Sequence, residues 1–205
     1  MHTDPLNCPQ CGSALPLTFS FAKLAVCEQC DSTIFLEDDS VRLAGKSAVL
    51  TKLPSLIQLK QPFSYRHTHY VPVGYIRYRY DYGYWDEWWV LDSSGQGVWM
   101  SVDEGDFAFE HPEKISEKLP DFQLMRTEQT TTIRGKEWKI TERGHAVCEG
   151  FQGELPEIIE QGETFDYVHL SGPQKELMTL EYFDADEIYA YRGKWVDPFD
   201  IKVSQ

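Results

Sequence analysis

The sequence predicts a mostly β fold, with an N-terminal zinc ribbon in residues 1–45 followed by an antiparallel β domain made of two related lobes. Two cysteine pairs near the N-terminus predict the ribbon. Runs rich in Tyr, Trp and Val, separated by Gly-containing turns, predict the strands. No stretch of about eleven residues has a convincing helical period. We place the two lobes in residues 55–121 and 122–197.

The cysteine pairs are CxxC motifs, Cys8 with Cys11 and Cys27 with Cys30, and fifteen residues separate them. This spacing brings four thiolates around one tetrahedral ion, as a structural zinc site requires. A redox CxxC normally stands at a helix N-terminus in a βαβ context, and a reducing compartment argues against disulfides. Iron binds the same four thiolates, so zinc is favoured and iron stays an alternative. All four ligands are protein groups, so we expect no catalytic role for the metal.

The segments around the cysteines predict a small β ribbon. In the first knuckle Pro9 fixes one φ and Gly12 permits a positive φ, which turns backbone amides toward the sulfur of Cys8. The second pair has neither residue, so we expect a less regular knuckle there. Short strands are expected at residues 15–21, 23–26 and 33–36. Because a ribbon of this size buries little apolar surface, metal binding would supply the missing folding free energy.

The first lobe contains the most aromatic part of the chain. Residues 75–80, 85–91 and 98–102 have the composition of strands and are joined by Gly-containing turns, so we expect a three-stranded antiparallel meander. In its second strand, alternation places Trp85, Glu87 and Trp89 on one face and Asp86 and Trp88 on the other. Such a strand is covered on both sides, or it offers one side to a partner.

The same strand is the candidate ligand or partner surface. Its residues are Trp85, Asp86, Glu87, Trp88 and Trp89. Aromatic faces attract ammonium groups and neighbouring carboxylates add complementary charge, so a polyamine or a Lys/Arg-rich peptide would suit this surface. The interpretation that we favour is plainer. The Trp side chains belong to the core, and the acids cap a turn or pair with Arg77 and Arg79 across the hairpin.

The second lobe weakly repeats the first. Residues 99–103 resemble residues 177–181. The expected strands of the second lobe are residues 136–141, 146–151, 167–170, 178–182 and 187–191. Two related β lobes follow from this repeat.

Other reactive residue types give weaker signals. His67 and His69 fall on one strand face, but no further ligand stands at metal-binding spacing, so exposed histidines are expected. Asp86 and Glu87 point to opposite faces and cannot act together on one substrate bond. Glu142 and Glu154 would have to converge through the fold. Cys148 has no His at a recognisable spacing and is expected to be a buried small hydrophobe. We therefore predict no catalytic residues.

The net charge of the chain disfavours some classes of binding partner. The net charge is −14 and the sequence pI is near 4.8, and no segment gathers Lys and Arg. Nucleic acids and anionic lipid surfaces attract clustered cations, so we expect neither as a partner. The start of the chain lacks the features of a signal peptide, and no apolar run has the length of a membrane span. These observations predict a cytoplasmic protein.

Several motifs taken in order resemble a known family. They are Gly74-Tyr75, residues 85–91, residues 97–101, residues 142–144, residues 153–156 and residues 191–196. In this order they resemble a bacterial family catalogued as domain of unknown function 4178, over residues 55–197. The resemblance implies a β-rich domain, commonly preceded by a zinc ribbon, that works beside membrane-stress proteins and polyamine-related enzymes. It supplies no catalytic residues. Glu157 stands where the family leads us to expect an aromatic residue, which puts a pocket there in doubt.

Two functional hypotheses follow. The first is a non-catalytic zinc-binding β module that acts as a protein-interaction or scaffold component, with another protein as its partner. The alternative is a small-molecule domain that senses or processes a polycation such as a polyamine. The aromatic and acidic β strands motivate both hypotheses, and binding of a polyamine would distinguish them.

Overall fold

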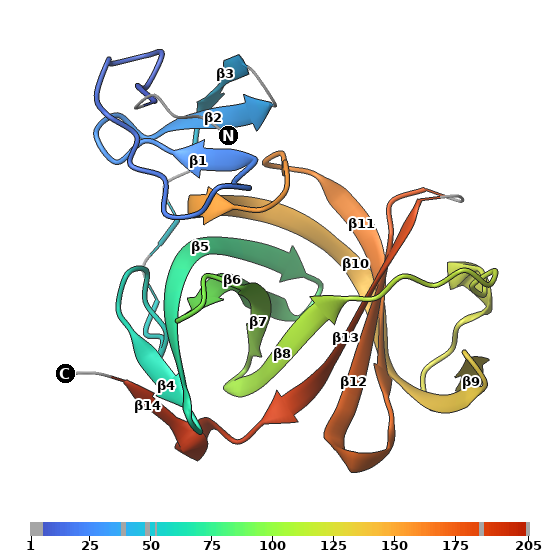
Figure 1. Ribbon diagram of the computed structural model, residues 1–205. Helices are drawn as coiled ribbons and strands as arrows, with labels where there is room; N and C mark the ends of the chain where they lie inside the picture. The colour runs from blue at the N-terminus through green and yellow to red at the C-terminus, as the bar shows by residue number, and fades with distance from the viewer. Residues whose placement is uncertain (1–5, 38–39, 48–49, 52, 185–186, 204–205) are drawn as a thin grey trace.

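The protein is described by a computed structural model that covers residues 6–37, 40–47, 50–51, 53–184 and 187–203. Within these residues the chain forms one 14-stranded antiparallel sheet, which confirms the expected mostly β fold. Figure 1 shows the sheet curled into a barrel, with the N-terminal ribbon packed against one side of it. Residues 1–5 and 38–39 of the expected ribbon lie outside the described residues.

Eight of the strands close into the barrel. They are β5 (Thr68–Tyr80), β6 (Gly83–Asp92), β7 (Gly97–Asp103), β8 (Asp106–Pro112), β10 (Lys136–Leu155), β11 (Thr164–Ser171), β12 (Glu176–Tyr182) and β13 (Ile188–Val196). Their order is β5-β6-β7-β8-β13-β12-β11-β10, and pairing of β10 with β5 completes the ring. The first half of the ring thus comes from the first expected lobe and the second half from the second. The limits that we expect for the lobes stay a prediction.

The seam between β5 and β10 depends on two glycines. A Cβ on Gly74 would lie 2.1 Å from the carbonyl oxygen of Glu154, and a Cβ on Gly153 would lie 2.1 Å from the carbonyl oxygen of Val73. Gly153 also has a φ of +76°, in the region that favours glycine. The two strands therefore approach so closely at this point that side chains are excluded.

Strand β10 differs from the sequence-based expectation. Residues 136–141 and 146–151 were expected to be separate strands, but they belong to one strand of 20 residues. Irregularities in the pairing occur between Ile140 and Glu142 and between Cys148 and Gly150. Such irregularities bend a strand without ending it. The bends let β10 pair with β11, β5, β9 and the ribbon along its length.

The ribbon contains three strands, β1 (Leu24–Val26), β2 (Ser32–Glu37) and β3 (Ser40–Lys46). Two of them were expected and β3 was not. The strand expected at residues 15–21 is absent, because Pro16 has no N–H for a ladder and the N–H of Thr18 bonds the Glu154 carboxylate instead. β1 pairs with the end of β10, so the ribbon sheet continues the barrel sheet.

Short elements cover the outside of the barrel. They are β4 (Phe63–Tyr65), β9 (Thr130–Ile133), β14 (Ile201–Val203), and the 3₁₀ turns η1 (Phe122–Leu124), η2 (Pro173–Lys175) and η3 (Pro198–Asp200). β4 and β14 pack with the outward side chains of β6 and β7, including Trp88 and Met100. β6 therefore lies between this outer cover and the barrel interior, in line with the first of the two alternatives that its sequence left open.

Candidate metal centre and barrel cavity

The two cysteine loops of the ribbon have the same local structure. In the first, the N–H of Gly12 donates to the carbonyl of Cys8 over 2.8 Å; in the second, the N–H of Asp31 donates to the carbonyl of Cys27 over 2.9 Å. Gly12 has a φ of +77° and Asp31 a φ of +55°. Asp tolerates this region better than most residues, so it replaces the glycine of the first loop. The second knuckle is therefore as regular as the first, contrary to expectation.

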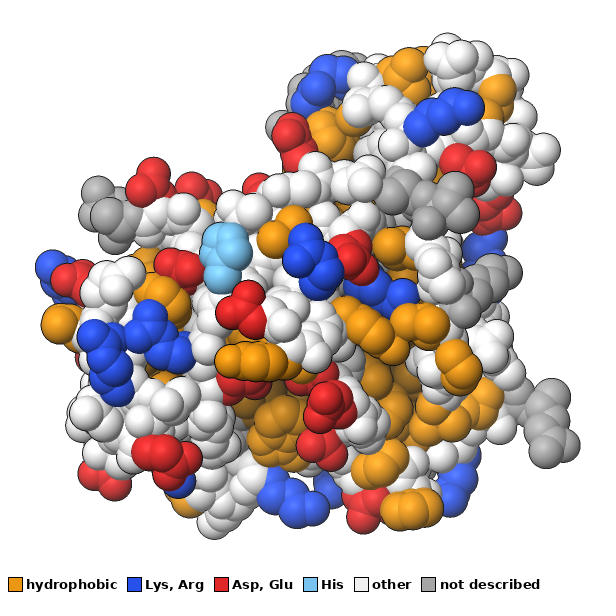
Figure 2. Space-filling view, turned by 180° about the vertical axis from the view of Figure 1, so that it is seen from behind, with side chains coloured by type: hydrophobic (Ala, Val, Ile, Leu, Met, Phe, Trp, Pro, Cys, Tyr) orange, Lys and Arg blue, Asp and Glu red, His pale blue; other side chains and the backbone are white. Residues whose placement is uncertain are grey.

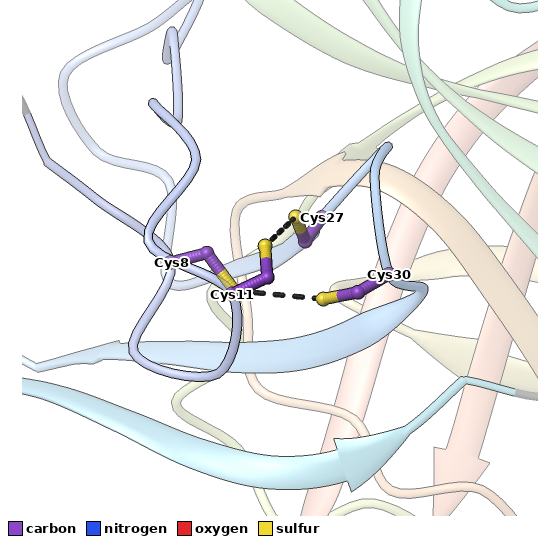
Figure 3. A group of neighbouring side chains, drawn as sticks. All are labelled: Cys8, Cys11, Cys27 and Cys30. Carbon is purple, nitrogen blue, oxygen red and sulfur yellow. Dashed lines mark hydrogen bonds between the residues drawn. The ribbon is translucent and has the colours of Figure 1, made fainter.

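The two loops bring the four sulfurs into one cluster. The Sγ atoms of Cys8 and Cys30 are 3.7 Å apart, and so are those of Cys11 and Cys27 (Figure 3). All four ligand atoms lie within 4.8 Å of one another. A tetrahedron with metal–sulfur distances of about 2.3 Å has edges of about 3.8 Å, so the cluster has the size of a zinc cage. The structure thus contains a four-cysteine site able to bind a metal ion.

The surroundings of the thiols are uneven. Hydrogen bonds from Ser13 lower the pKa of Cys11 to about 6, whereas burial raises the pKa of Cys27 to about 11. Cys8 and Cys27 are buried, while Cys11 is exposed. A bound cation would compensate the burial of negative sulfur, because metal coordination favours the thiolate over the thiol.

The ribbon and the barrel share one apolar core. Phe19 of the ribbon packs on Trp89 of β6 at a ring distance of 6.3 Å, and Leu24 and Ile34 belong to the same buried cluster as Trp99 of β7. Thr18 adds two hydrogen bonds to the Glu154 carboxylate, from its N–H at 2.7 Å and its hydroxyl at 2.6 Å. The metal site is therefore joined to the barrel by packing as well as by strand pairing.

The barrel encloses a cavity of about 510 Å³. Inward-facing residues of β6, β7, β8, β10, β11, β12 and β13 line it. Its aromatic walls are Trp85, Trp99, Tyr191 and Trp195, and its carboxylates are Glu87, Asp103, Glu104, Asp106, Glu110, Glu142 and Glu181. No Lys or Arg occurs among the described residues that line it. The cavity is consequently both acidic and aromatic.

The deepest carboxylates differ in the number of hydrogen bonds that they accept. Glu110 accepts hydrogen bonds from Ser101 at 2.6 Å and Thr179 at 2.7 Å, one on each oxygen. Glu87 accepts one, from Nε1 of Trp85 at 2.9 Å. Glu181 is only 8% exposed, and no described residue donates a hydrogen bond to its carboxylate. Its oxygens are not among the fully buried polar atoms that lack a partner, and Glu181 borders the cavity, so its carboxylate remains available to accept a hydrogen bond from a ligand.

Burial changes the protonation of these groups. It raises the pKa of Glu87 to about 8 and that of Glu181 well above its ordinary value, and other nearby carboxylates add to the effect on both. Burial also raises the pKa of Asp103 to about 6. The side chain of Glu87 lies inside the barrel. It is partly exposed, because it borders the cavity.

One wall of the cavity carries a histidine–carboxylate pair. Nδ1 of His169 lies 3.3 Å from Glu142, whose other oxygen accepts a hydrogen bond from the Tyr167 hydroxyl at 2.7 Å. The bond to His169 lowers the pKa of Glu142. Glu154 is bonded to the ribbon instead, so Glu142 and Glu154 serve different contacts. The convergence of these two glutamates, which the sequence left open, does not occur, and sequence reasoning did not identify His169.

The five residues of the candidate strand are divided between the two sides of the barrel wall. Trp85 and Glu87 line the cavity, and Trp89 packs with the core beneath the ribbon. Trp88 and Asp86 face the outer cover. Trp85, Trp88 and Trp89 are 5%, 5% and 9% exposed, so they are core residues, as in the interpretation that we favoured. The five therefore do not form one exposed surface.

The two arginines expected across the hairpin behave differently. Nε of Arg77 lies 2.8 Å from Asp86 in a buried ion pair, which confirms that expectation. Arg79 instead pairs with Glu149 of β10 at 3.2 Å, and no described Lys or Arg forms an ion pair with Glu87. The reason is the pleat, which points Glu87 into the barrel and Arg79 outward.

The two histidines and the fifth cysteine that the sequence singled out have no partner at metal-binding distance among the described residues. His67 and His69 are exposed, and His67 is in the turn before β5 rather than in a strand. Cys148 is 1% exposed and is a buried hydrophobe. Among the described residues, the four ribbon cysteines are the group of metal-ligand side chains that the structure brings together.

Several cavity residues were missed by sequence reasoning. They are Glu110, Thr179, Glu181, Tyr191 and Trp195. A usable signal was present in β12, because Leu177, Thr179 and Glu181 alternate with apolar residues and so place an acid on the inward face of a buried strand. An acid on the inward face of a strand that closes a barrel indicates a cavity rather than a packed core.

The chain was compared with protein families, curated proteins and solved structures. No curated protein and no solved structure matches the chain significantly. In the part of the chain that the structure describes, no helical segment has the length and apolar character needed to span a bilayer. Residues 58–198, which contain the whole barrel, match one protein family. The chain belongs to the family described as Domain of unknown function (DUF4178).

Proposed function

We propose that the barrel binds a small organic cation, such as an aliphatic amine, in its cavity. The observation that carries this proposal is Glu181, a carboxylate 8% exposed that borders a cavity of about 510 Å³ and has no hydrogen-bond donor among the described residues. A cation beside Glu181 would supply the missing partner. The volume is in the range of small-molecule sites.

The walls of the cavity support the same ligand class. The faces of Trp85, Trp99 and Tyr191 offer electron-rich surfaces that attract ammonium groups. Glu142, whose pKa is lowered by its bond to His169, adds negative charge, and no described lining residue is a Lys or Arg that would neutralise it. An anionic ligand would be repelled by this field, so charge selects cations.

Binding, rather than turnover, is the role that we propose. The hydroxyls of Ser101 and Thr179 both donate to Glu110, and His169 is bonded to Glu142. None of these contacts joins a hydroxyl nucleophile to the histidine, as an activated nucleophile would require. The protein would then hold or sense the cation.

Calorimetry with spermidine at low salt tests the proposal. We expect saturable binding by the native protein, a loss of affinity of about tenfold or more in Glu181→Gln, and an unchanged affinity in Glu137→Gln, a matched control on the exposed side of β10. Citrate should give no saturable binding. The proposal is wrong if spermidine and putrescine give no heat at millimolar concentration.

For the ribbon we propose zinc as the bound ion, in a reducing compartment such as the cytoplasm. The four thiolates form a closed tetrahedral set, and the sulfurs are too far apart for disulfides, which need about 2.05 Å. Elemental analysis of purified protein should find about one zinc ion per chain. Stoichiometric iron, with the visible absorption of an iron–thiolate centre, would contradict this assignment.

Protein docking is a second candidate function, and one observation favours it. Leu53, Leu56, Tyr82 and Tyr84 are 37%, 42%, 91% and 42% exposed and lie around neighbouring hollows on the outer surface. Figure 2 shows apolar side chains gathered on the lower part of one face. In a pull-down, the double variant Leu56→Ser/Tyr82→Ser should no longer capture the partner. The variant Phe199→Ser, which changes an exposed residue elsewhere, is the control and should still capture it. Equal capture by both variants would remove this candidate.

A further inference from the structure

The titratable groups around the deep carboxylates are almost all acidic. Glu87 of β6 and Glu181 of β12 interact electrostatically with each other and with Glu110 of β8. Other titratable groups also face this set or act on it. They are Tyr78 of β5, Asp103 of β7, Glu104 between β7 and β8, Asp106 of β8, Glu142 and Cys148 of β10, Glu157 and Glu163 before β11, Tyr167 and His169 of β11, and Tyr191 of β13. Lys23 acts on Glu157 and is exposed. Among the described residues, the main influences on the pKa of Glu87 and of Glu181 include burial and other carboxylates but no cation.

Hydrogen bonding does not compensate for this crowding. Both oxygens of Glu110 accept hydroxyl hydrogens, which accounts for one charge. Glu87 has a single donor, the indole of Trp85, and Glu181 has none among the described residues. Two further negative charges next to Glu110 in a partly dehydrated cavity would repel one another and lose solvation. Neutral carboxylic acids avoid both costs, in agreement with the raised pKa of each group.

We propose that the cavity takes up its cationic ligand in exchange for protons that Glu87 and Glu181 hold in the ligand-free barrel. This inference rests on the proposed cation binding. An arriving ammonium group keeps its own protons, each glutamic acid that it contacts releases one proton to the solvent, and a carboxylate–ammonium pair replaces the neutral acid. Each proton that leaves is replaced by one positive charge of the ligand at the carboxylate that released it.

The exchange makes binding depend on pH in a defined direction. For each proton released, the apparent affinity for the cation rises by up to about tenfold per pH unit while the acids are protonated in the ligand-free state. The contribution of Glu87 to this rise levels off above its pKa of about 8. A preformed ion-pair site with ordinary carboxylates would show no such rise near neutral pH.

Calorimetry with spermidine in two buffers of different ionisation enthalpy, phosphate and Tris, measures the exchange. We expect different heats in the two buffers, corresponding to release of between about one and about two protons per ligand near pH 7. Glu87→Gln and Glu181→Gln should each reduce that number, whereas Glu137→Gln should leave it unchanged. Binding with equal heats in both buffers would overturn the exchange and leave cation binding intact, while absence of binding would overturn both.

A second measurement needs no ligand. Infrared difference spectra of the native protein against Glu181→Gln near pH 7 should show the carbonyl band of a protonated carboxylic acid in the native protein. Spermidine should replace that band by carboxylate bands. If the ligand-free native protein shows only carboxylate bands, the proton exchange is wrong even where the cation binds.

Discussion

The ribbon and the barrel each gather anionic ligand groups, but they do so in opposite ways. In the ribbon, two short loops bring four sulfurs within 4.8 Å, which leaves room for one ion and no open position. In the barrel, carboxylates from separate strands border a cavity of about 510 Å³. A closed site stabilises the fold that forms it. An open site whose acids lack partners leaves acceptor groups available to the ligand that we propose.

The largest effect should come from breaking the closed site. Cys27→Ser removes a buried ligand, and we expect loss of the metal together with a fall in Tm of about 10 °C or more, because metal binding contributes folding free energy and the ribbon shares its core with the barrel. Metal analysis and thermal unfolding measure both. Cys148→Ala, at the buried cysteine outside the cluster, is the control and should retain the metal. A metal-free Cys27→Ser protein with an unchanged Tm would show that the ion does not stabilise the fold.

The second prediction contrasts a paired carboxylate with the unpaired ones. Arg77→Met leaves Asp86 buried without its cation, and we expect a loss of about 3–5 kcal/mol in the free energy of unfolding, measured in urea. The double variant Arg77→Met/Asp86→Leu should recover most of that loss, since no buried charge remains. If the double variant is as unstable as the single one, packing rather than charge explains the effect.

The third prediction concerns the unpaired acids themselves. Glu87 has an ordinary pKa of 4.5 and a pKa of about 8 in the folded protein, so the folded state binds more protons than the unfolded state between these values. The free energy of unfolding should therefore fall as pH rises from about 4.5 to about 8, and Tm should fall by several degrees. Glu87→Gln should flatten this slope. A native protein whose stability rises with pH over that window would contradict the raised pKa.

The smallest effect is expected where the two regions meet. Glu154→Ala removes the acceptor of two hydrogen bonds from Thr18, and we expect a loss of about 1 kcal/mol because strand pairing and Phe19 still hold the ribbon. Glu154→Gln keeps an acceptor and should lose less. Urea unfolding measures the stability, and amide hydrogen exchange at Thr18 should become faster. An unchanged exchange rate at Thr18 would show that Glu154 does not order this loop.

Sequence spacing predicted the closed site because its ligands are local. The two cysteines of each CxxC pair lie in the same turn of the chain. The sequence argument therefore had to infer only that the two turns come together. The meander of β5, β6 and β7 was predicted for the same reason, since tight turns join its strands. The missed strand β3 and the absent strand at residues 15–21 show the limit of this reasoning, because pairing partners decided both.

The open site could not be predicted in the same way. Glu87 and Glu110 come from the β6-β7-β8 meander, whereas Glu181 is far from both in the sequence and reaches them because β12 pairs with β13, β13 pairs with β8 and β10 pairs with β5. Alternation correctly placed Glu87 beside Trp85 on one face, but it could not tell that this face lines a hollow interior. Closure of the ring is a long-range property, and no local pattern contains it.

The continuity of β10 with the ribbon has a practical consequence for shortened versions of the chain. The end of β10 is covered by β1 at Leu155 and Glu154, next to apolar side chains such as Trp89 that Phe19 shields. A fragment that starts after the ribbon would keep the barrel strands and leave this edge unpaired beside an uncovered apolar surface. Such edges associate with one another, so the fragment should aggregate, and the barrel is best produced with its ribbon attached.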